Sequence, residues 1–497
     1  MKSHLLIFVL LIASLCSNAA TNVILEHSET LSFSKKSGRD YQILRGNVRF
    51  SHEGAVMYCD SAYFYDTNNS FDAFGNVRVV QDTMSLNSES LYYDGNTRVM
   101  KVRGNVVLRN GQMTLTTDWL DYFRDANYGY YSDGGKLVDP NFTITSNVGY
   151  YHPKAKLSFF KGNVKLVNPE YSIVTDSLKS NDATKVASVF GPSEILYSDY
   201  VVKTTYAWTN TQTQYGHLYN YSVLTGKDGS FMTADSIHFS REEGTVELFH
   251  NAVALDDSTH TGFSGDYANL KRHPDKGFIV GKACMMDYSN PNDTMYLHGD
   301  TIRFFSDTTG HRHLFAYHKV KLFSLDLQGK CDSLTYLQAD SLIRLDGTPV
   351  IWSDVSQMAG DTIKIYTKGT KPDWMHIEGS AFIIQQQAKD CFDQLSGKES
   401  KAYLEGTRLK QVDMMSGATS LYYAQDDRSR LIGVNKCEGP MLSIFLKNNK
   451  MEHIKMTPES KGTMFPPGKL PEGQDKLRGF NNRNEERPKS KDDIFIW

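Results

Sequence analysis

The sequence has 497 residues, with 54 Lys or Arg against 57 Asp or Glu, which gives a formal net charge of −3 at pH 7. This near-balance, with 22% charged residues, excludes a polycationic nucleic-acid-binding chain and a highly charged disordered chain. Beyond residue 20, no apolar stretch reaches the about 18 residues that a membrane-spanning helix needs.

The N-terminal residues predict a secretory signal peptide over residues 1–20. The apolar run Leu5–Leu15 follows a short basic start and closes in small residues at Ala20. We therefore expect export and a mature chain that begins near Thr21. Lipidation of Cys16 is the less favoured alternative, because the preceding residue is not small.

Next along the chain, two landmarks recur with one period. Gly-Asn-Val occurs at Gly46, Gly75, Gly104 and Gly162, and Gly191 follows as Gly-Pro-Ser, so the spacings are 29, 29, 58 and 29 residues. A second landmark lies 14 residues after the Gly-Asn-Val glycines, at Asp60, Glu89, Asp118 and Asp176, and Asn147 fills the slot for which Gly134 is the shifted glycine. Degenerate copies continue to about residue 385 and predict about twelve stacked units of ~29 residues over 21–385.

Within a unit, apolar residues alternate with polar ones, which predicts short strands with one apolar face. Stacking places equivalent residues above one another, so the apolar faces should form columns around a dry interior. The side chains expected to line this interior groove are Val48, Phe50, Met57, Val77, Val79, Met84, Leu86, Val106, Leu108, Met113, Leu115, Phe142, Ile144, Val164, Leu166 and Ile173. An interior filled only by its own core is the alternative for each of them.

The charged columns predict structure rather than chemistry. The acidic landmark recurs where the strand pattern changes register, and Asx side chains often bind backbone turns at such places. The basic column Arg49, Arg78, Lys136 and Lys165 alternates with the apolar residues and should point outward, although lipid phosphates would suit it.

The last part of the chain departs from the period. Residues 386–457 are expected to add divergent strands, such as Thr419–Tyr423 and Leu442–Leu446, and residues 458–497 form a tail rich in proline and charge, expected to be largely irregular. His311, His313 and His318 are the only histidine cluster, which lacks an identifiable third ligand for zinc. Catalytic motifs are not found, so we expect no enzyme activity, no cofactor and no metal.

The order of these motifs resembles the OstA-like family, the LptA-type periplasmic proteins of lipopolysaccharide transport. The resemblance rests on the Gly-Asn-Val turn and the following Asp-Ser-aromatic strand, as in Cys59–Tyr63. Cys331–Leu334, Pro349–Trp352, Gly360–Ile363 and the ending Arg487–Phe495 resemble the large OstA-like subgroup. The resemblance implies an elongated all-β jellyroll that carries lipopolysaccharide, with the acyl chains between two sheets.

On this reading, the protein is periplasmic, associates with the outer membrane, and bridges inner- and outer-membrane lipopolysaccharide-transport proteins. We expect open end strands, the first at Ile43 and Leu44, to pair with partners or with further copies end to end. About twelve units advancing by two strands of about 4.8 Å each would give an array on the order of 100 Å. The alternatives are a parallel β-helix enzyme acting on polysaccharide and a structural or adhesive β-solenoid; no nucleic-acid partner is expected.

Overall fold

The computed structural model describes residues 21–34, 41–152, 154–272, 274–369, 371–388, 391–406, 408–426, 428, 430–447 and 450–497. The predicted signal peptide and Cys16 lie outside the described residues. Across the described part, the secondary structure is strands and short 3₁₀ turns without any α-helix, and each strand pairing given below is antiparallel. The all-β prediction is therefore confirmed. The chain divides into two units, residues 1–198 and 199–497, which are described separately.

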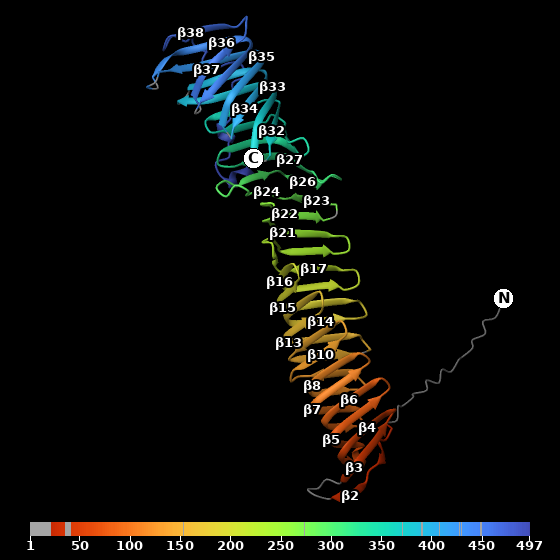
Figure 1. Ribbon diagram of the computed structural model, residues 1–497. Coiled ribbons are helices and arrows are strands. Elements are labelled where there is room, and N and C mark those ends of the chain that lie inside the picture. Colours follow the sequence, from red (N-terminus) through yellow and green to blue (C-terminus); the bar gives the residue numbers. More distant parts are fainter. Residues whose placement is uncertain are drawn as a thin grey trace, which may run out of the picture. The chain divides into compact units, whose positions relative to one another are not determined.

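Unit 1 is an antiparallel stack in which each long strand pairs with the next one along the chain (Figure 1). Its elements are β1 (Ile24–His27), β2 (Thr30–Ser34), β3 (Tyr41–His52), β4 (Ala55–Tyr65), the 3₁₀ turn η2 (Asp66–Asn68), β5 (Ser70–Gln81), β6 (Met84–Asp94), β7 (Val99–Asn110), β8 (Met113–Phe123), β9 (Tyr128–Tyr131), β10 (Gly135–Asp139), β11 (Phe142–Ser146), β12 (Val148–His152), β13 (Leu157–Val167), β14 (Tyr171–Asn181) and β15 (Val186–Tyr197).

The strands of unit 1 follow the 29-residue period. Six of them, β3, β5, β7, β9, β13 and β15, begin at residues 41, 70, 99, 128, 157 and 186, each 29 residues after the one before. The strands β4, β6, β8, β11 and β14 begin at residues 55, 84, 113, 142 and 171 with the same spacing. The periodic landmarks therefore mark equivalent strands.

The glycine step interrupts each long strand. Gly46 and Asn47 have φ values of +80° and +47°, and the pairing of β3 with β4 shifts register between Arg45 and Val48. The acidic landmark of the preceding strand meets this step: Asn76 Nδ2 donates to Asp60 at 2.8 Å, and Asn47 Nδ2 makes the same contact with Glu29 at 2.6 Å. The structural use predicted for the acidic column is confirmed at these positions.

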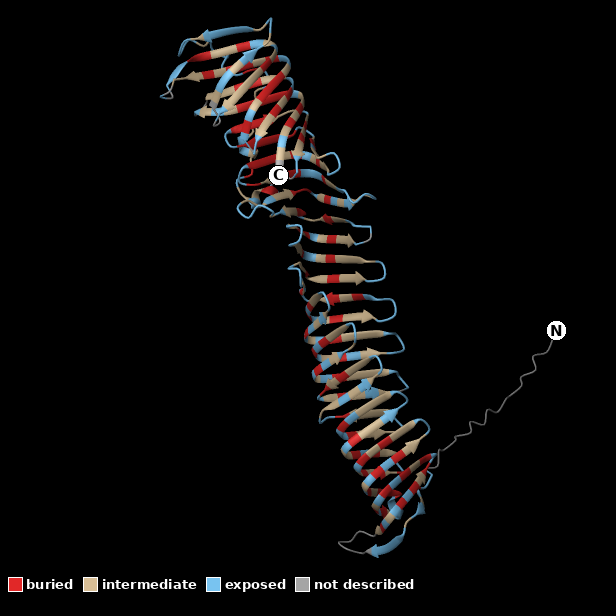
Figure 2. Ribbon diagram, viewed as in Figure 1, coloured by how far each residue is buried: buried red, intermediate tan, exposed pale blue. Residues whose placement is uncertain are grey.

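The interruption divides every long strand into two halves, and the halves form two facing walls. Wall A contains the halves between the glycine step and the acidic landmark, such as Val48–His52 and Ala55–Cys59, whereas wall B contains the other halves, such as Tyr41–Arg45 and Ser61–Tyr65. Phe50 of wall A stacks on Phe71 of wall B with ring centroids 4.2 Å apart, which shows that the walls enclose a common core. Buried and exposed residues alternate along the strands (Figure 2).

The first strand of unit 1 is not, as the sequence predicted, the strand that contains Ile43 and Leu44. β1 and β2 precede β3, and both pair with it, β2 through wall B and β1 through wall A. Ile43 and Leu44 therefore do not lie in an edge strand, and Leu44 is fully buried. The prediction was wrong because the residues before the first periodic glycine carry too little of the repeat to reveal two more strands.

Unit 2 is also an antiparallel arrangement of strands. Its elements are β16 (Tyr200–Asn210), β17 (Tyr215–Tyr219), β18 (Ser222–Gly226), β19 (Phe231–Ala234), β20 (Ser236–Ser240), β21 (Thr245–Asp256), β22 (Thr261–Lys271), β23 (Lys276–Val280), β24 (Cys284–Asp287), β25 (Met295–His298), β26 (Thr301–Ser306), β27 (Arg312–Phe323), β28 (Leu327–Leu337), β29 (Leu342–Asp346), β30 (Val350–Ser353), β31 (Ser356–Ala359), β32 (Thr362–Lys368), β33 (Lys371–Ala388), β34 (Cys391–Glu405), β35 (Arg408–Gln425), β36 (Leu431–Lys447), β37 (Lys450–Met456), β38 (Lys461–Phe465), η3 (Asn484–Glu486) and η4 (Lys491–Phe495).

The C-terminal tail packs on the outer face of wall A in unit 2. Gln357 and Gln394 each hold an extended stretch of tail backbone: Gln357 binds the carbonyl of Asn481 and the N–H of Arg483, both at 2.8 Å. Leu477 joins a second apolar core with Phe382, Ile384, Leu421, Tyr423 and Val434. The tail is largely irregular in backbone, as expected, yet it is anchored along its length.

Candidate functional site

The interior between the walls contains the residues that the alternation predicted. Ten of the sixteen candidates are buried, and six are half-buried. The buried ones are Val48, Phe50, Met57, Val77, Val79, Leu86, Val106, Ile144, Val164 and Ile173, and the half-buried ones are Met84, Leu108, Met113, Leu115, Phe142 and Leu166. From β7 onward, half-buried candidates therefore alternate with buried ones, such as Ile144 and Val164.

The first strands of unit 1 are filled by their own side chains. Phe50 contacts Phe64 and Phe71 across the two walls, with ring centroids 5.4 and 4.2 Å apart, and both Phe50 and Phe71 are fully buried. Packing of this kind excludes water and leaves no space for a ligand. The self-filled alternative holds for this part of the interior.

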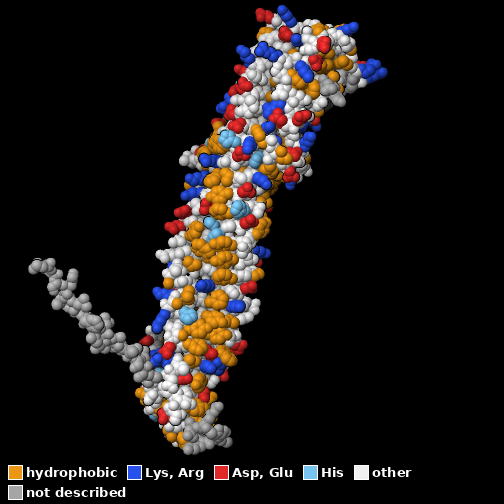
Figure 3. Space-filling view, turned by 180° about the vertical axis from the view of Figure 1, so that it is seen from behind, with side chains coloured by type: hydrophobic (Ala, Val, Ile, Leu, Met, Phe, Trp, Pro, Cys, Tyr) orange, Lys and Arg blue, Asp and Glu red, His pale blue; other side chains and the backbone are white. Residues whose placement is uncertain are grey.

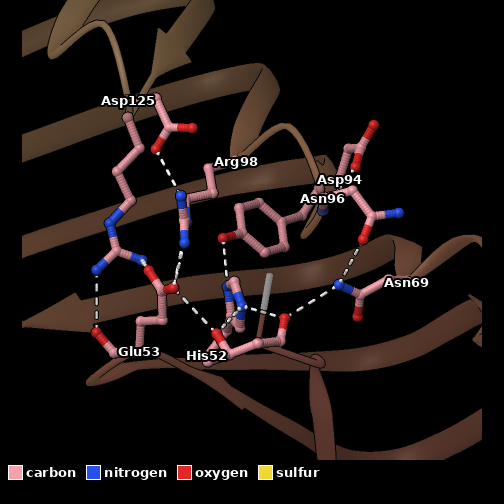
Figure 4. Close-up of polar contacts among 10 residues, drawn as sticks. His52, Glu53, Asn69, Asp94, Asn96, Arg98 and Asp125 are labelled. Carbon is pink, nitrogen blue, oxygen red and sulfur yellow. Dashed lines mark hydrogen bonds and ion pairs between the residues drawn. The ribbon is translucent and has the colours of Figure 1, made fainter. Parts of the chain in front are cut away.

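The N-terminal residues Thr21 and Val23 contact hairpins of both walls beside this sealed part; Figure 4 labels His52 and Asn69, the residues that they contact. The main-chain N–H of Val23 donates to Asn69 Oδ1 at 2.7 Å at the tip of a wall B hairpin. His52, at a wall A hairpin, lies 2.8 Å from the carbonyl of Thr21 through Nε2 and 2.7 Å from the Tyr93 hydroxyl through Nδ1. Thr21–Val23 thus connects the tips of the two walls.

An ion-pair cluster beside this segment also joins the walls (Figure 4). Glu53, in a wall A hairpin, accepts from Arg98 at 2.7 Å and lies 3.2 Å from Arg124, and both arginines come from wall B hairpins. Hydrogen bonding by Arg98 lowers the pKa of Glu53 below its ordinary value. Glu53, Arg98 and Arg124 are not part of either periodic landmark, so the repeat did not predict this ion-pair cluster.

Beyond the residues that Thr21 and Val23 contact, several inner side chains of unit 1 are half-exposed. Leu108 and Leu115 face each other across the β7–β8 pairing and pack against the edge of the sealed core, yet both remain half-exposed. Leu137 and Leu166 continue the same inner register on β10 and β13 and are also half-exposed. Met84 and Met113 lie at the hairpin ends of wall A, which places them at the rim. We use the name apolar trough for the half-exposed inner residues from Leu108 onward in unit 1.

Unit 2 has a small, partly open pocket of about 50 Å³. Ile383 and Leu395 line it from wall A, and Ile444 and Leu446 line it from the opposite side. Asp393 also borders the cavity, where it accepts hydrogen bonds from the N–H of Tyr423 at 2.8 Å and from Gln387 at 2.5 Å. Burial raises the pKa of Asp393 to about 7.

The other candidates have ordinary surroundings. Arg49, Arg78, Lys136 and Lys165 are exposed, as predicted for an outward column. His313 lies 3.3 Å from the Asp307 carboxylate, which also accepts a hydrogen bond from the main-chain N–H of His311. His318 lies 3.4 Å from the carboxylate of Asp332. Within the described residues, acidic, histidine and cysteine side chains form no group of three or more suited to a metal ion.

The same part of the chain contains no helix long and apolar enough to cross a membrane.

Comparisons with known proteins identify one family. The model of the family described as OstA-like protein matches residues 20–176, which confirms the predicted resemblance over that segment. The crystal structure of LptH, the LptA-homologous periplasmic component of the conserved lipopolysaccharide transport device from Pseudomonas aeruginosa, is similar at 13% identity and a TM-score of 0.22. That alignment covers 28% of this chain and 95% of LptH. No curated protein matches the chain.

Proposed function

We propose that the protein is a non-enzymatic, periplasmic carrier of lipopolysaccharide that holds acyl chains in the apolar trough. The OstA-like match over residues 20–176 supports this, because it spans the sealed strands and the start of the trough. The observation that carries the proposal is the half-exposed state of Leu108, Leu115 and Leu137, which are paired on the inner register of the neighbouring strands β7, β8 and β10.

An acyl chain suits such a surface. It offers no directional groups and needs only continuous apolar contact, and each buried CH₂ is worth roughly 0.8 kcal/mol. The sealed strands before Leu108 leave no room for lipid, so the proposed lipid path begins at β7 and β8. Flexible Met113 at the rim would adapt to acyl chains that lie in different positions.

Exposed edges support the bridging part of the proposal. Leu31 and Phe33 on β2 are 57% and 58% exposed, and the described pairings of β2 involve one neighbour, β3. A second chain that adds a strand there would cover both side chains. Membrane-bound lipopolysaccharide-transport proteins and further copies of this chain are the partners we propose for these edges.

The two alternatives are a parallel β-helix enzyme and a structural solenoid. Antiparallel pairing of the described strands is incompatible with a parallel β-helix, so that fold is excluded for this part of the chain. A self-filled structural solenoid is favoured by the sealed core around Phe50 and Phe71 and by the buried inner residues beyond it, such as Val164.

Native mass spectrometry of the full chain, purified from its own envelope in mild detergent, tests the proposal. Co-purified lipopolysaccharide, removed by the substitution Leu115→Asp while the far-ultraviolet spectrum is retained, is the expected result. Protein free of lipid in repeated preparations would contradict the carrier and favour the self-filled solenoid.

A further inference from the structure

A strip of aromatic side chains covers the outer face of wall B in unit 2. It crosses six neighbouring strands, β16, β17, β20, β21, β22 and β23, which pair in this order. We call it the aromatic strip; its members are Tyr206, Trp208, Tyr215, His217, Tyr219, His238, Phe249, Tyr267 and Phe278. At about 4.8 Å per strand, the strip spans about 24 Å.

The strip lies outside the walls and is separate from the trough. The residues that alternate with it, among them Leu218, Ile237 and Leu248, are buried in the interior. Its own rings are half-buried, and Tyr215 is 39% exposed. Figure 3 shows hydrophobic side chains gathered in patches on the surface, with histidines beside them. Apolar patches on a protein surface commonly mark binding sites.

The rings form one connected series across the strands. His217 contacts Tyr219 and His238 with centroids 3.6 and 3.7 Å apart, and His238 lies 4.7 Å from Phe249. Phe249 continues to Tyr267 at 5.0 Å, and Tyr267 to Phe278 at 5.7 Å. Each ring is held by its neighbours, so the surface is preorganised for a ligand.

Polar groups lie among the rings. Glu247 occupies the middle of the strip, where it accepts hydrogen bonds from the Tyr267 hydroxyl at 2.5 Å and from Asn269 Nδ2 at 3.2 Å. Trp208 Nε1 lies 3.4 Å from the Tyr219 hydroxyl. The strip therefore combines aromatic faces with donors and acceptors that a ligand's hydroxyl groups can engage.

We propose that the aromatic strip binds a linear, uncharged segment of a glycan chain. The faces of a pyranose ring present C–H groups, which aromatic faces attract, and its edge presents hydroxyls, which Glu247 and Asn269 can bind. A chain running across the strands would place successive sugars over successive rings, because the strand spacing is close to the length of one sugar unit.

The charge of the strip disfavours other ligands. An anionic membrane surface or a nucleic acid requires cations, yet the centre of the strip carries Glu247, whereas Lys271, Lys276 and Arg303 lie at its β22–β23 end. Burial lowers the pKa of His217 to about 4, so this imidazole is uncharged near neutral pH. The core of a protein interface is depleted in carboxylates such as Glu247.

The test is calorimetric titration of the full mature chain with a neutral, linear glucan oligosaccharide of about six units. A lipid-free core oligosaccharide released from lipopolysaccharide is titrated in parallel. Binding of the glucan supports the inference, whereas binding of the anionic core oligosaccharide alone would overturn it in favour of a charged saccharide.

Substitutions inside and outside the aromatic strip test whether the oligosaccharide binds there. Trp208→Ala and Phe278→Ala should each weaken binding by about tenfold, whereas Tyr221→Asn, an exposed aromatic position outside the strip, should leave it unchanged. Absence of binding by both oligosaccharides, or equal affinity in all variants, would overturn the inference. Binding only to phosphatidylglycerol vesicles would overturn it in favour of a membrane surface. Leu115→Asp should retain glycan binding, which separates this result from the proposed lipid trough.

Discussion

The Cα atom of Gly75 lies directly against the carboxylate of Asp60. A Cβ at residue 75 would be 2.5 Å from Asp60 Oδ2, and the φ of Gly75 is +74°. The glycine of each repeat therefore serves two needs: a left-handed backbone and the close approach of the acidic landmark from the preceding strand.

Substitution of Gly75 should destabilise the fold because of the contact with Asp60, beyond the effect of the positive φ. Gly75→Asn should cost about 1–3 kcal/mol of folding free energy, because asparagine tolerates positive φ but collides with Asp60. Gly111→Asn is the matched control, since Gly111 has φ +58° and open space around its Cα. Thermal unfolding followed by circular dichroism measures the difference; equal shifts in the two variants would show that the contact with Asp60 is unimportant.

The buried Asp393 makes stability depend on pH. Its pKa in the folded chain, about 7, lies above the ordinary value of 3.8, so folding strengthens proton binding. This contribution is fully present below about pH 4 and is lost as the pH rises through about 7.

Asp393→Asn keeps the acceptor for Tyr423 and removes the charge. We expect the variant to unfold at a higher temperature than the parent at about pH 8, with the difference shrinking as the pH approaches 4. Asp340→Asn, at an exposed position, should show neither effect. A variant that is less stable than the parent at the higher pH would mean that the carboxylate is paired and charged there.

The docked tail should contribute to the stability of unit 2. Leu477→Asp places a charge in the second core and should cost about 2–4 kcal/mol, while Gln394→Ala removes two bonds to tail backbone and should cost about 1–3 kcal/mol. Limited proteolysis should then cleave the tail faster. Glu472→Ala, on the exposed side of the tail, is the control, and equal cleavage rates in all three variants would contradict a docked tail.

The edge of unit 1 offers a test of bridging. Replacing Leu31 and Phe33 by lysine should weaken association with partners or copies while the fold is retained, since both side chains are exposed on β2. Analytical ultracentrifugation and co-purification measure the association. If neither changes, the edge at β2 is not a contact surface.

The period and the alternation predicted most of the fold. They identified equivalent strands and placed Val48, Val77 and Val106 in the interior, because the same packing problem recurs in each unit. They did not reveal the closure by Thr21–Val23, since it forms once and leaves no repeated trace.

The tail and the aromatic strip were missed for different reasons. Gln328 and Gln357 are 29 residues apart on one outer row of wall A, which was a usable signal that something polar covers this face. Tail docking depends on contacts between residues more than a hundred positions apart, such as Arg483 with Gln357, and local patterns do not encode these. The strip consists of outward residues, and alternation alone does not distinguish a binding face from an ordinary one.

The central claim, an apolar trough that holds acyl chains from β7 onward, is tested most directly by site-specific photo-crosslinking in cells. A photoreactive side chain at Leu115 faces the trough, whereas one at the adjacent Thr116 faces outward from the same strand. The account predicts that lipopolysaccharide is captured at residue 115 and not at residue 116. Capture at neither residue, or equally at both, would contradict it.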